Sequence, residues 1–183
     1  ILVGANIIAF LWLLGMMYTT KILDGLDGLS TGVCAIGAFA VAALAGGTTK
    51  FYQPDVSLVA LILGGACLGF LFFNFYPAKI FLGEGGSQFL GLMLGTLAII
   101  AGSKIATALL VMAVPIVDLV WVISQRLFGG QSIAQGDRRH LHFRLVDAGL
   151  KQWQAALIFY GLSILFGFSA LFMKSGFKLI SLI

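Results

Sequence analysis

Long apolar runs separated by short polar junctions dominate this chain. The runs cover residues 1–20, 29–45, 56–75, 88–101, 105–127 and 154–173, and a further run begins at residue 177. Because an α-helix rises about 1.5 Å per residue, about 20 residues span the roughly 30 Å hydrocarbon core of a bilayer. The pattern therefore predicts an all-α protein, a polytopic transmembrane helix bundle of about six spans plus a truncated seventh.

Composition supports the same class. Hydrophobic residues make up 60% of the chain and charged residues only 10%, whereas soluble domains average about 45–50% and roughly 25%. The sequence starts at Ile1 and stops at Ile183, both within apolar runs. We interpret residues 1–183 as a single transmembrane domain, truncated at both ends, that lies in a lipid bilayer and has no nucleic-acid partner.

Three polar junctions interrupt the apolar pattern, at residues 21–30, 76–87 and 128–153. Two predicted spans separate each junction from the next, and an even number of crossings returns the chain to the same side. Seven of the eleven basic residues fall on that side, which the positive-inside rule identifies as cytoplasmic. These residues are Lys21, Lys79, Arg126, Arg138, Arg139, Arg144 and Lys151. Most acidic residues gather there as well, so the pattern indicates a polar site on the cytoplasmic face.

The first junction combines two carboxylates with two glycines. Asp24 and Asp27 are three residues apart, so in a helical turn both side chains point to one face. Gly25 and Gly28 leave the backbone open to close approach by a ligand. Two convergent carboxylates suit Mg²⁺ shared with substrate phosphates. The alternative is a simple turn in which Asp27 or Ser30 caps the next helix.

The second junction places Glu84 inside a glycine-rich stretch at a predicted helix start. Backbone N–H groups at a helix N-terminus favour phosphate, and Glu84 is a candidate ligand for a metal ion beside it. Phe81 is a candidate for stacking on a base. The alternative is a flexible turn between two helices.

The third junction is the most charged part of the chain. Asp137 is predicted to be the N-cap, and Gly149 the C′ residue, of a short cytoplasmic interfacial helix. His140 and Arg144, four residues apart, share one face of it and suit a diphosphate; the alternative is a basic helix that touches anionic lipid. Asp118 lies inside the preceding apolar run, where an ionisable group is a functional candidate or a helix-packing hydrogen-bond partner.

Four motifs, in this order, carry a resemblance to a known family. They are DGLDGLSTG at 24–32, NFYPAKIFLGEGGSQFLG at 74–91, VPIVD at 114–118 and DRRHLHFRL at 137–145. Together they resemble the polyprenyl-phosphate N-acetylhexosamine-1-phosphate transferases, which form glycosyltransferase family 4. The single H-x-H followed by Phe143, rather than three consecutive histidines, is more similar to the undecaprenyl-phosphate N-acetylglucosamine-1-phosphate transferase branch than to the pentapeptide branch.

The resemblance implies a role for each residue that matches a family motif. It implies catalytic roles for Asp24, His140 and His142, a uridine pocket lined by Asp27 and Phe81, and Mg²⁺ ligands in Glu84 and Asp24, with Mn²⁺ as an alternative metal. We add Lys21, Gly25 and Arg144 as substrate-binding candidates, because the two cations suit phosphates and the glycine admits a ligand close to the backbone.

The implied activity is a phosphoryl transfer by a transmembrane catalytic domain. An N-acetylhexosamine 1-phosphate, with N-acetylglucosamine 1-phosphate favoured, passes from a UDP-sugar to polyprenyl (undecaprenyl) phosphate, and UMP is released. This is the first membrane step of cell-wall or surface polysaccharide synthesis. The implied partners are UDP-N-acetylhexosamine, polyprenyl phosphate and the bilayer, with a homodimer left open. The implied location is the inner (plasma) membrane, multi-pass, with the active site on the cytoplasmic face.

Three other functions stay open at this point. The first is a phospho-MurNAc-pentapeptide transferase. The second is a membrane transporter, in which Asp118 near Pro115 belongs to a broken helix of an ion pathway. The third is an inactive scaffold, because Glu84 stands where the family has Asp, and Lys21 and Tyr18 stand where it usually has Asn.

Overall fold

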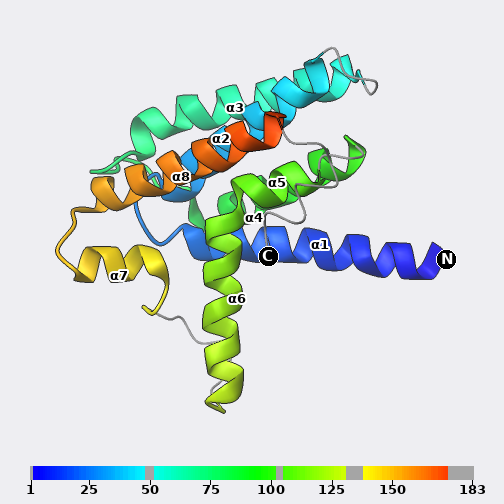
Figure 1. The fold of residues 1–183 in the computed structure, drawn as a ribbon. Coiled ribbons are helices and arrows are strands. Elements are labelled where there is room, and N and C mark those ends of the chain that lie inside the picture. Colours follow the sequence, from blue (N-terminus) through cyan, green and yellow to red (C-terminus); the bar gives the residue numbers. More distant parts are fainter. Residues whose placement is uncertain (1, 48–51, 102–104, 131–137, 173–183) are drawn as a thin grey trace.

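The structure, a computed structural model, describes residues 2–47, 52–101, 105–130 and 138–172. Every regular element within those ranges is an α-helix, which confirms the predicted class. The helices are α1 (Leu2–Leu23), α2 (Leu29–Gly46), α3 (Pro54–Asn74), α4 (Gly83–Ile100), α5 (Ile105–Val111), α6 (Ala113–Phe128), α7 (Leu141–Asp147) and α8 (Gln152–Phe172). Figure 1 shows their arrangement.

Four helices are long and apolar enough to cross a membrane, namely α1, α2, α3 and α8. A fifth span is obtained if α5 and α6 count as one broken span. The protein is therefore a multi-pass membrane protein with four to five candidate spans in the described residues. The predicted count of about six is not confirmed, because α4 is not among these candidates. The predicted seventh span, from residue 177, lies outside the described residues.

The apolar run 105–127, which the sequence predicts as one span, is sharply bent. Helix α5 ends at Val111 and α6 begins at Ala113, and their axes differ by 76°. Pro115 explains the break, because it has no N–H to donate to the carbonyl of Val111 and its ring collides with that carbonyl in a continuous helix. Helix α6 consequently runs away from the rest of the bundle (Figure 1).

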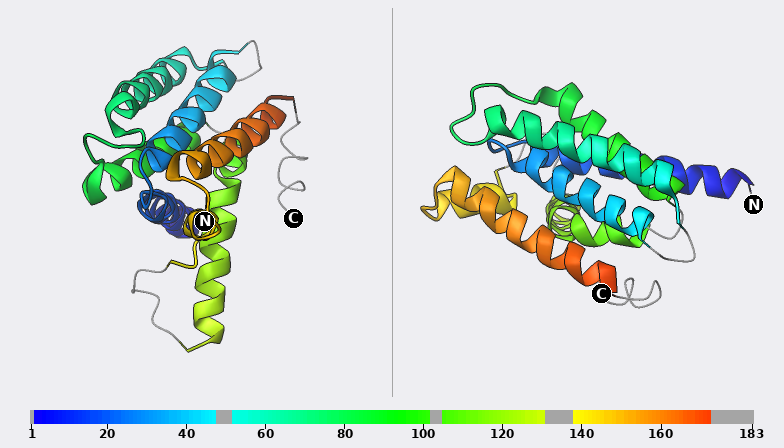
Figure 2. Two further views of the ribbon diagram at one scale, coloured as in Figure 1. Left: turned by 90° about the vertical axis from the view of Figure 1, so that its left-hand side faces the viewer. Right: turned by 90° about the horizontal axis from the view of Figure 1, so that it is seen from above.

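Helix α2 forms the centre of the fold. It packs against α3, α8, α4 and α5, and Figure 2 shows α3 and α8 on either side of it. Small residues allow this close approach. A side chain at Gly32 would overlap the ring of Tyr160 on α8, and the Tyr160 hydroxyl donates a 2.6 Å hydrogen bond to the carbonyl of Gly28.

Helices α1 and α4 form an antiparallel pair below α2. The indole Nε1 of Trp12 donates a 3.0 Å hydrogen bond to the carbonyl of Gly95. Gly91 on α4 lies close to Met16, which is about one turn further along α1 than Trp12. A side chain at position 91 would collide with the backbone of Met16. The C-terminal end of α1 and the N-terminal end of α4 therefore meet, and both ends carry candidate site residues.

Candidate functional site

The first and third polar junctions are in direct contact. A Cβ atom added to Gly25 would lie 2.7 Å from His142 Nε2 and 2.7 Å from Phe143 Cζ. Only glycine at position 25 leaves room for α7 to pack on the turn after α1. The DGLDG stretch and the H-x-H stretch therefore form two walls of one site.

The first and second junctions are also in contact. The backbone N–H of Ala78 donates a 3.0 Å hydrogen bond to Oδ2 of Asp27, and Lys21 forms an ion pair with Glu84. The crossing count that predicted this convergence is not confirmed, because α4 is not a candidate span and the α5–α6 pair is bent. The contacts themselves bring the three junctions to the same end of the fold.

Residues 24–28 form a turn between α1 and α2, so the prediction that both carboxylates share a helix face is wrong. The N-cap of α2 is Gly28, which has a left-handed φ of 74° and makes no side-chain cap. The expectation that Asp27 or Ser30 caps the helix is wrong too. The Ser30 hydroxyl instead donates a 3.1 Å hydrogen bond to the carbonyl of Thr20, and the Asp27 carboxylate accepts from the second junction.

The Asp24 carboxylate has no hydrogen-bond or ion-pair partner among the residues that the structure describes. The side chain is partly buried, and this burial raises its pKa from 3.8 to about 6. A carboxylate that loses hydration without gaining a partner is energetically costly. A partly buried carboxylate with a raised pKa is a typical functional candidate, and Asp24 is the one predicted site carboxylate with neither oxygen bonded to a described residue.

Glu84 is held by two neighbours. Lys21 pairs with its Oε1 atom, and Gln88 Nε2 donates to the same oxygen at 3.1 Å. The Lys21 contact holds the pKa of Glu84 below its usual range. Oε2 keeps no partner among the described residues. The structure therefore joins the predicted phosphate-binding lysine to the predicted metal ligand, a pairing that the sequence does not indicate.

The carboxylates of Asp24 and Glu84 suit a Mg²⁺ ion that is shared with substrate phosphates, rather than one enclosed by protein side chains alone. No group of three or more His, Cys, Asp or Glu side chains in the described residues gathers as a metal site. Mg²⁺ in phosphate-transferring enzymes is typically bound by only one or two carboxylates, together with waters and substrate phosphates. The unpartnered Asp24 and the open Oε2 of Glu84 match that donor chemistry.

Asn74 organises the second junction, a role that the sequence analysis missed. Its Oδ1 accepts a 2.9 Å hydrogen bond from the Thr31 hydroxyl, and its Nδ2 donates a 3.0 Å bond to the carbonyl of Ile80. The buried amide thus ties the loop after α3 to α2. Phe81 follows the loop with 76% of its surface exposed, free of the hydrophobic core. The sequence signal for the role of Asn74 was a single asparagine at the end of an apolar run.

Asp118 on α6 contacts the start of α7 through both oxygens. Oδ2 lies 2.9 Å from Nδ1 of His140, and Oδ1 accepts a 2.9 Å hydrogen bond from the backbone N–H of Leu141. An ionised carboxylate only accepts hydrogen bonds, so Nδ1 carries the proton. The structure shows the hydrogen bonds expected of Asp118 as a packing residue, and its functional role stays a prediction.

Helix α7 begins three residues later than predicted. His140 is its N-cap residue and makes no side-chain cap, and the predicted cap, Asp137, lies outside the described residues. The prediction for the other end is confirmed. Gly149, at φ 102°, follows the C-cap and donates a 2.9 Å hydrogen bond to Val146, an arrangement that ends many helices.

His142 is buried at the contact with the first junction, 1% exposed. Its Nε2 atom has no hydrogen-bond partner in the part of the chain that the structure describes. Burial, together with the neighbouring His140, lowers its pKa to about 4, so the ring is neutral near pH 7. His142 therefore presents an uncharged nitrogen to the turn that carries Gly25, whereas His140 is bonded to a carboxylate.

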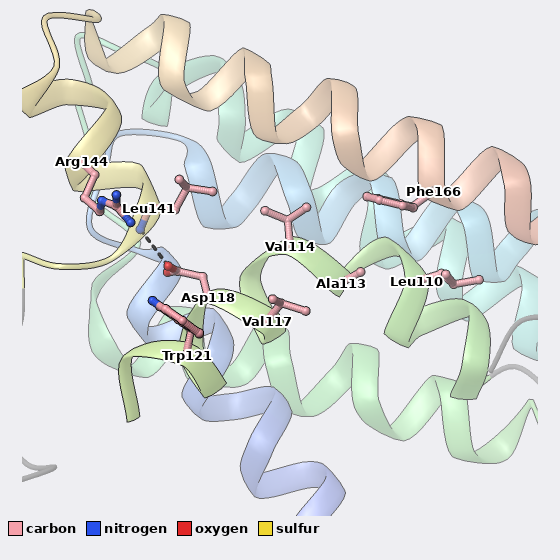
Figure 3. Close-up of a pocket in the computed structure, with 9 residues that line it drawn as sticks. All are labelled: Leu110, Ala113, Val114, Val117, Asp118, Trp121, Leu141, Arg144 and Phe166. Carbon is pink, nitrogen blue, oxygen red and sulfur yellow. Dashed lines mark hydrogen bonds between the residues drawn. The ribbon is translucent and has the colours of Figure 1, made fainter. Parts of the chain in front are cut away.

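A pocket of about 440 Å³ lies beside this site, between α5, α6, α7 and α8. Figure 3 shows Asp118 and Arg144 near one end and Leu110 and Phe166 near the other. The remaining lining residues are apolar: Ala113, Val114, Val117, Trp121 and Leu141. Arg144 is exposed and has no polar partner among the described residues. The predicted substrate-binding arginine therefore faces a largely apolar space.

Comparisons with known proteins agree with the resemblance drawn from the four motifs. The family model of glycosyl transferase family 4 matches residues 1–102. A probable undecaprenyl-phosphate N-acetylglucosaminyl 1-phosphate transferase of Bacillus subtilis is 38% identical over 173 residues, which are 90% of this chain and 47% of that protein.

Two further relatives represent other branches. A decaprenyl-phosphate N-acetylglucosaminephosphotransferase of Mycolicibacterium smegmatis is 38% identical over 75% of this chain and 39% of its own length. A phospho-N-acetylmuramoyl-pentapeptide-transferase of Halalkalibacterium halodurans is 33% identical over 88% of this chain and 49% of its own length. The chain thus spans about half the length of the curated relatives it matches. On its motifs, its helical membrane fold and these matches, the chain belongs to glycosyl transferase family 4.

Proposed function

We propose that the whole protein transfers N-acetylhexosamine 1-phosphate, with N-acetylglucosamine 1-phosphate as the favoured group, from a UDP-sugar to polyprenyl phosphate. The observation that carries the proposal is the contact between the Asp24–Gly28 turn and the H-x-H helix at Gly25 and His142. It brings an unpartnered carboxylate and a neutral histidine to one site at the end of the membrane helices. The names of the relatives in Bacillus and Mycolicibacterium support the same reaction.

The reaction exchanges one phosphorus–oxygen bond for another. An oxygen of the polyprenyl phosphate forms a bond to the phosphorus that carries the sugar. The bond between that phosphorus and the bridging oxygen breaks, and UMP leaves with this oxygen and its electron pair. A phosphate monoester is largely ionised near pH 7, with a second pKa of about 6. The acceptor therefore needs no general base, and the protein's task is to position the phosphates and balance their charge.

Each site residue has a part in that task. Asp24 and Glu84 would hold Mg²⁺, with Mn²⁺ as an alternative; when bound, the metal neutralises phosphate charge. His140, fixed by Asp118, would face the diphosphate, and Gly25 would admit it close to the backbone. Asp27 and the exposed ring of Phe81 would bind uridine. His142 Nε2, buried without a partner, would gain one from the bound donor.

The active site would face the cytoplasm of a cell with an inner (plasma) membrane. Six of the eleven basic residues lie in the three junctions and a seventh, Arg126, lies just before the third. Basic residues favour the cytoplasmic side. A water-soluble donor and a lipid acceptor would then meet at the membrane surface. The product would enter the synthesis of a cell-wall or surface polysaccharide.

The test is UMP release by the full-length protein, with undecaprenyl phosphate, a UDP-sugar and Mg²⁺. Asp24→Asn should lower turnover by at least about 100-fold, the cost of losing a charge that stabilises the transition state. Asp55→Asn is the matched control, because Asp55 lies in the first turn of α3, away from the site, and should keep normal turnover. Equal turnover in the two variants would remove Asp24 from the reaction.

A second candidate is a phospho-MurNAc-pentapeptide transferase, which the relative in Halalkalibacterium favours. The same assay with UDP-MurNAc-pentapeptide in place of UDP-N-acetylglucosamine separates the two. Turnover with the pentapeptide donor alone would support this candidate.

A further inference from the structure

We infer that Tyr160 is a positioning residue for the transfer reaction, and that its hydroxyl holds the Asp24–Gly28 turn in place against the H-x-H helix. The inference rests on the proposed function and adds to it a residue outside the four sequence motifs. Tyr160 lies on α8, which the sequence pattern indicates only as a membrane span.

The turn before α2 ends in a peptide group that is hydrogen-bonded on both sides. The backbone N–H of Leu29 donates a 3.1 Å bond to the carbonyl of Leu26, which closes the turn. The carbonyl of Gly28 accepts a 2.9 Å bond from the backbone N–H of Gly32 and the 2.6 Å bond from the Tyr160 hydroxyl. The Gly32 bond belongs to α2 itself, so the Tyr160 bond is the one that fixes this peptide to another helix.

The ring of Tyr160 is held tightly against α2. A Cβ atom added to Gly32 would lie 2.1 Å from Cζ of that ring and 2.3 Å from its hydroxyl oxygen. The missing side chain at position 32 therefore lets the phenol reach the carbonyl of Gly28, about one turn earlier. A hydrogen bond within a protein is electrostatically stronger than the same bond in water, so this contact restrains the turn.

Helix α8 also contacts the other wall of the site. Phe159 is 1% exposed, and its ring lies edge-on to that of His142, with the centroids 6.4 Å apart and the planes at 71°. His142 in turn packs against Gly25. Two consecutive residues of α8, Phe159 and Tyr160, thus contact the H-x-H helix and the end of the Asp24–Gly28 turn. A single helix that touches both walls sets the distance between them.

The two ends of the turn differ in how they are held. The Asp24 carboxylate bonds to no described residue, so this side chain does not fix the turn. Asp27 is tied to the second junction by the backbone N–H of Ala78, which would hold the uridine pocket without help from α8. Loss of the Tyr160 hydroxyl should therefore reduce turnover more than donor binding.

Removing only the hydroxyl tests the inference in the full-length protein. In Tyr160→Phe the Gly28 carbonyl keeps its bond from Gly32, so no buried polar group loses its last partner. We expect kcat for UMP release to fall at least about tenfold, because misplacement by an ångström causes losses of that size or more. Binding of UDP-N-acetylglucosamine without acceptor should keep its Kd and its stoichiometry. The matched control is Tyr52→Phe, at an exposed tyrosine just before α3, which should keep the wild-type kcat.

A comparison of two substitutions separates positioning from packing. Tyr160→Leu removes the ring as well as the hydroxyl and should lower both the melting temperature and kcat. Tyr160→Phe should restore the melting temperature but not kcat. A wild-type kcat in Tyr160→Phe would overturn the inference, and so would a fall in kcat matched by an equal loss of donor-binding sites. If Tyr160→Leu does not fold, the result for Tyr160→Phe decides alone.

Amide hydrogen exchange separates this inference from the proposed function. Tyr160→Phe should speed exchange of the Leu29 amide about fivefold, the effect of losing one neutral hydrogen bond, and leave the middle of α3 unchanged. If exchange responds in this way but the wild-type protein releases no UMP from any UDP-sugar, the proposed function fails and the link from α8 to the turn stands. If the wild type releases UMP while exchange at Leu29 is unchanged, the hydroxyl does not hold the turn and the inference fails.

Discussion

Asp118 fixes His140 from a different helix. Its Oδ2 atom is 2.9 Å from Nδ1 of His140, while Oδ1 accepts from the backbone N–H of Leu141, also at 2.9 Å. The carboxylate thus provides for the first turn of α7 what an N-cap side chain normally provides. It sets both the position of the helix and the proton position on the His140 ring.

Exchanging Asp118 for its amide should separate these two effects. In Asp118→Asn the amide oxygen can still accept from Leu141, but the NH₂ group then faces the Nδ1–H of His140, and the ring must change tautomer. We expect kcat to fall about 10- to 100-fold, as for other residues that orient an active-site histidine, with little change in thermal stability. Asp147→Asn, which breaks only the exposed pair with Arg138, should have almost no effect. A similar kcat in both variants would contradict the positioning role.

Adding one methyl group at Gly25 should displace α7. The new Cβ would lie 2.7 Å from His142 Nε2 and 2.7 Å from Phe143 Cζ, closer than nonbonded atoms approach. We expect Gly25→Ala to lower kcat/KM at least about tenfold, because misplacement of a site by an ångström is enough for such losses, and to speed amide hydrogen exchange in α7. Gly161→Ala on α8 meets no atom within 4 Å and should behave like the wild type. Unchanged exchange in α7 of Gly25→Ala would show that the contact is not tight.

Asp24 should make activity and stability change in opposite directions with pH, because its ionised form is needed for turnover but costs stability. Burial raises its pKa from 3.8 to about 6, so the folded protein holds this proton more strongly than the unfolded chain. Stability therefore falls as pH rises from about 4 to about 6. We expect Asp24→Asn to have a higher melting temperature than the wild type at pH 7.5, with the difference disappearing near pH 4. Wild-type turnover should fall below about pH 6 as the carboxylate protonates. An equal melting temperature at pH 7.5 would mean that the ionised Asp24 is not destabilising.

The pair between Lys21 and Glu84 should restrain metal binding. Removing the ammonium in Lys21→Gln leaves Oε1 with only its hydrogen bond from Gln88 and returns the pKa of Glu84 toward its usual value. We expect a lower Mg²⁺ concentration for half-maximal UMP release, with little change in melting temperature because the pair is exposed. Lys79→Gln serves as the control for loss of a basic side chain in a site junction. A higher Mg²⁺ requirement in Lys21→Gln would instead support the sequence-based assignment of Lys21 to substrate phosphate.

Much of the architecture follows from local pattern. The apolar runs predict the helices, and Gly149 ends α7 where the sequence places its C′ residue. The four motifs identify the family over most of the polar residues. Pro115 was visible in the sequence, but the angle between α5 and α6 was not, because hydropathy records how apolar a segment is and not the direction in which it continues.

The sequence by itself determined which segments prefer lipid and which carry polar chemistry, because hydropathy and helix-ending residues act over a few neighbouring positions. Only the tertiary structure decided which polar groups meet. Lys21 and Glu84 are 63 residues apart, and Asp118 and His140 are 22 apart. Such partners depend on how the helices pack and on the angle at which α6 leaves α5. The same packing leaves the Asp24 carboxylate without a partner among the described residues and forms the site.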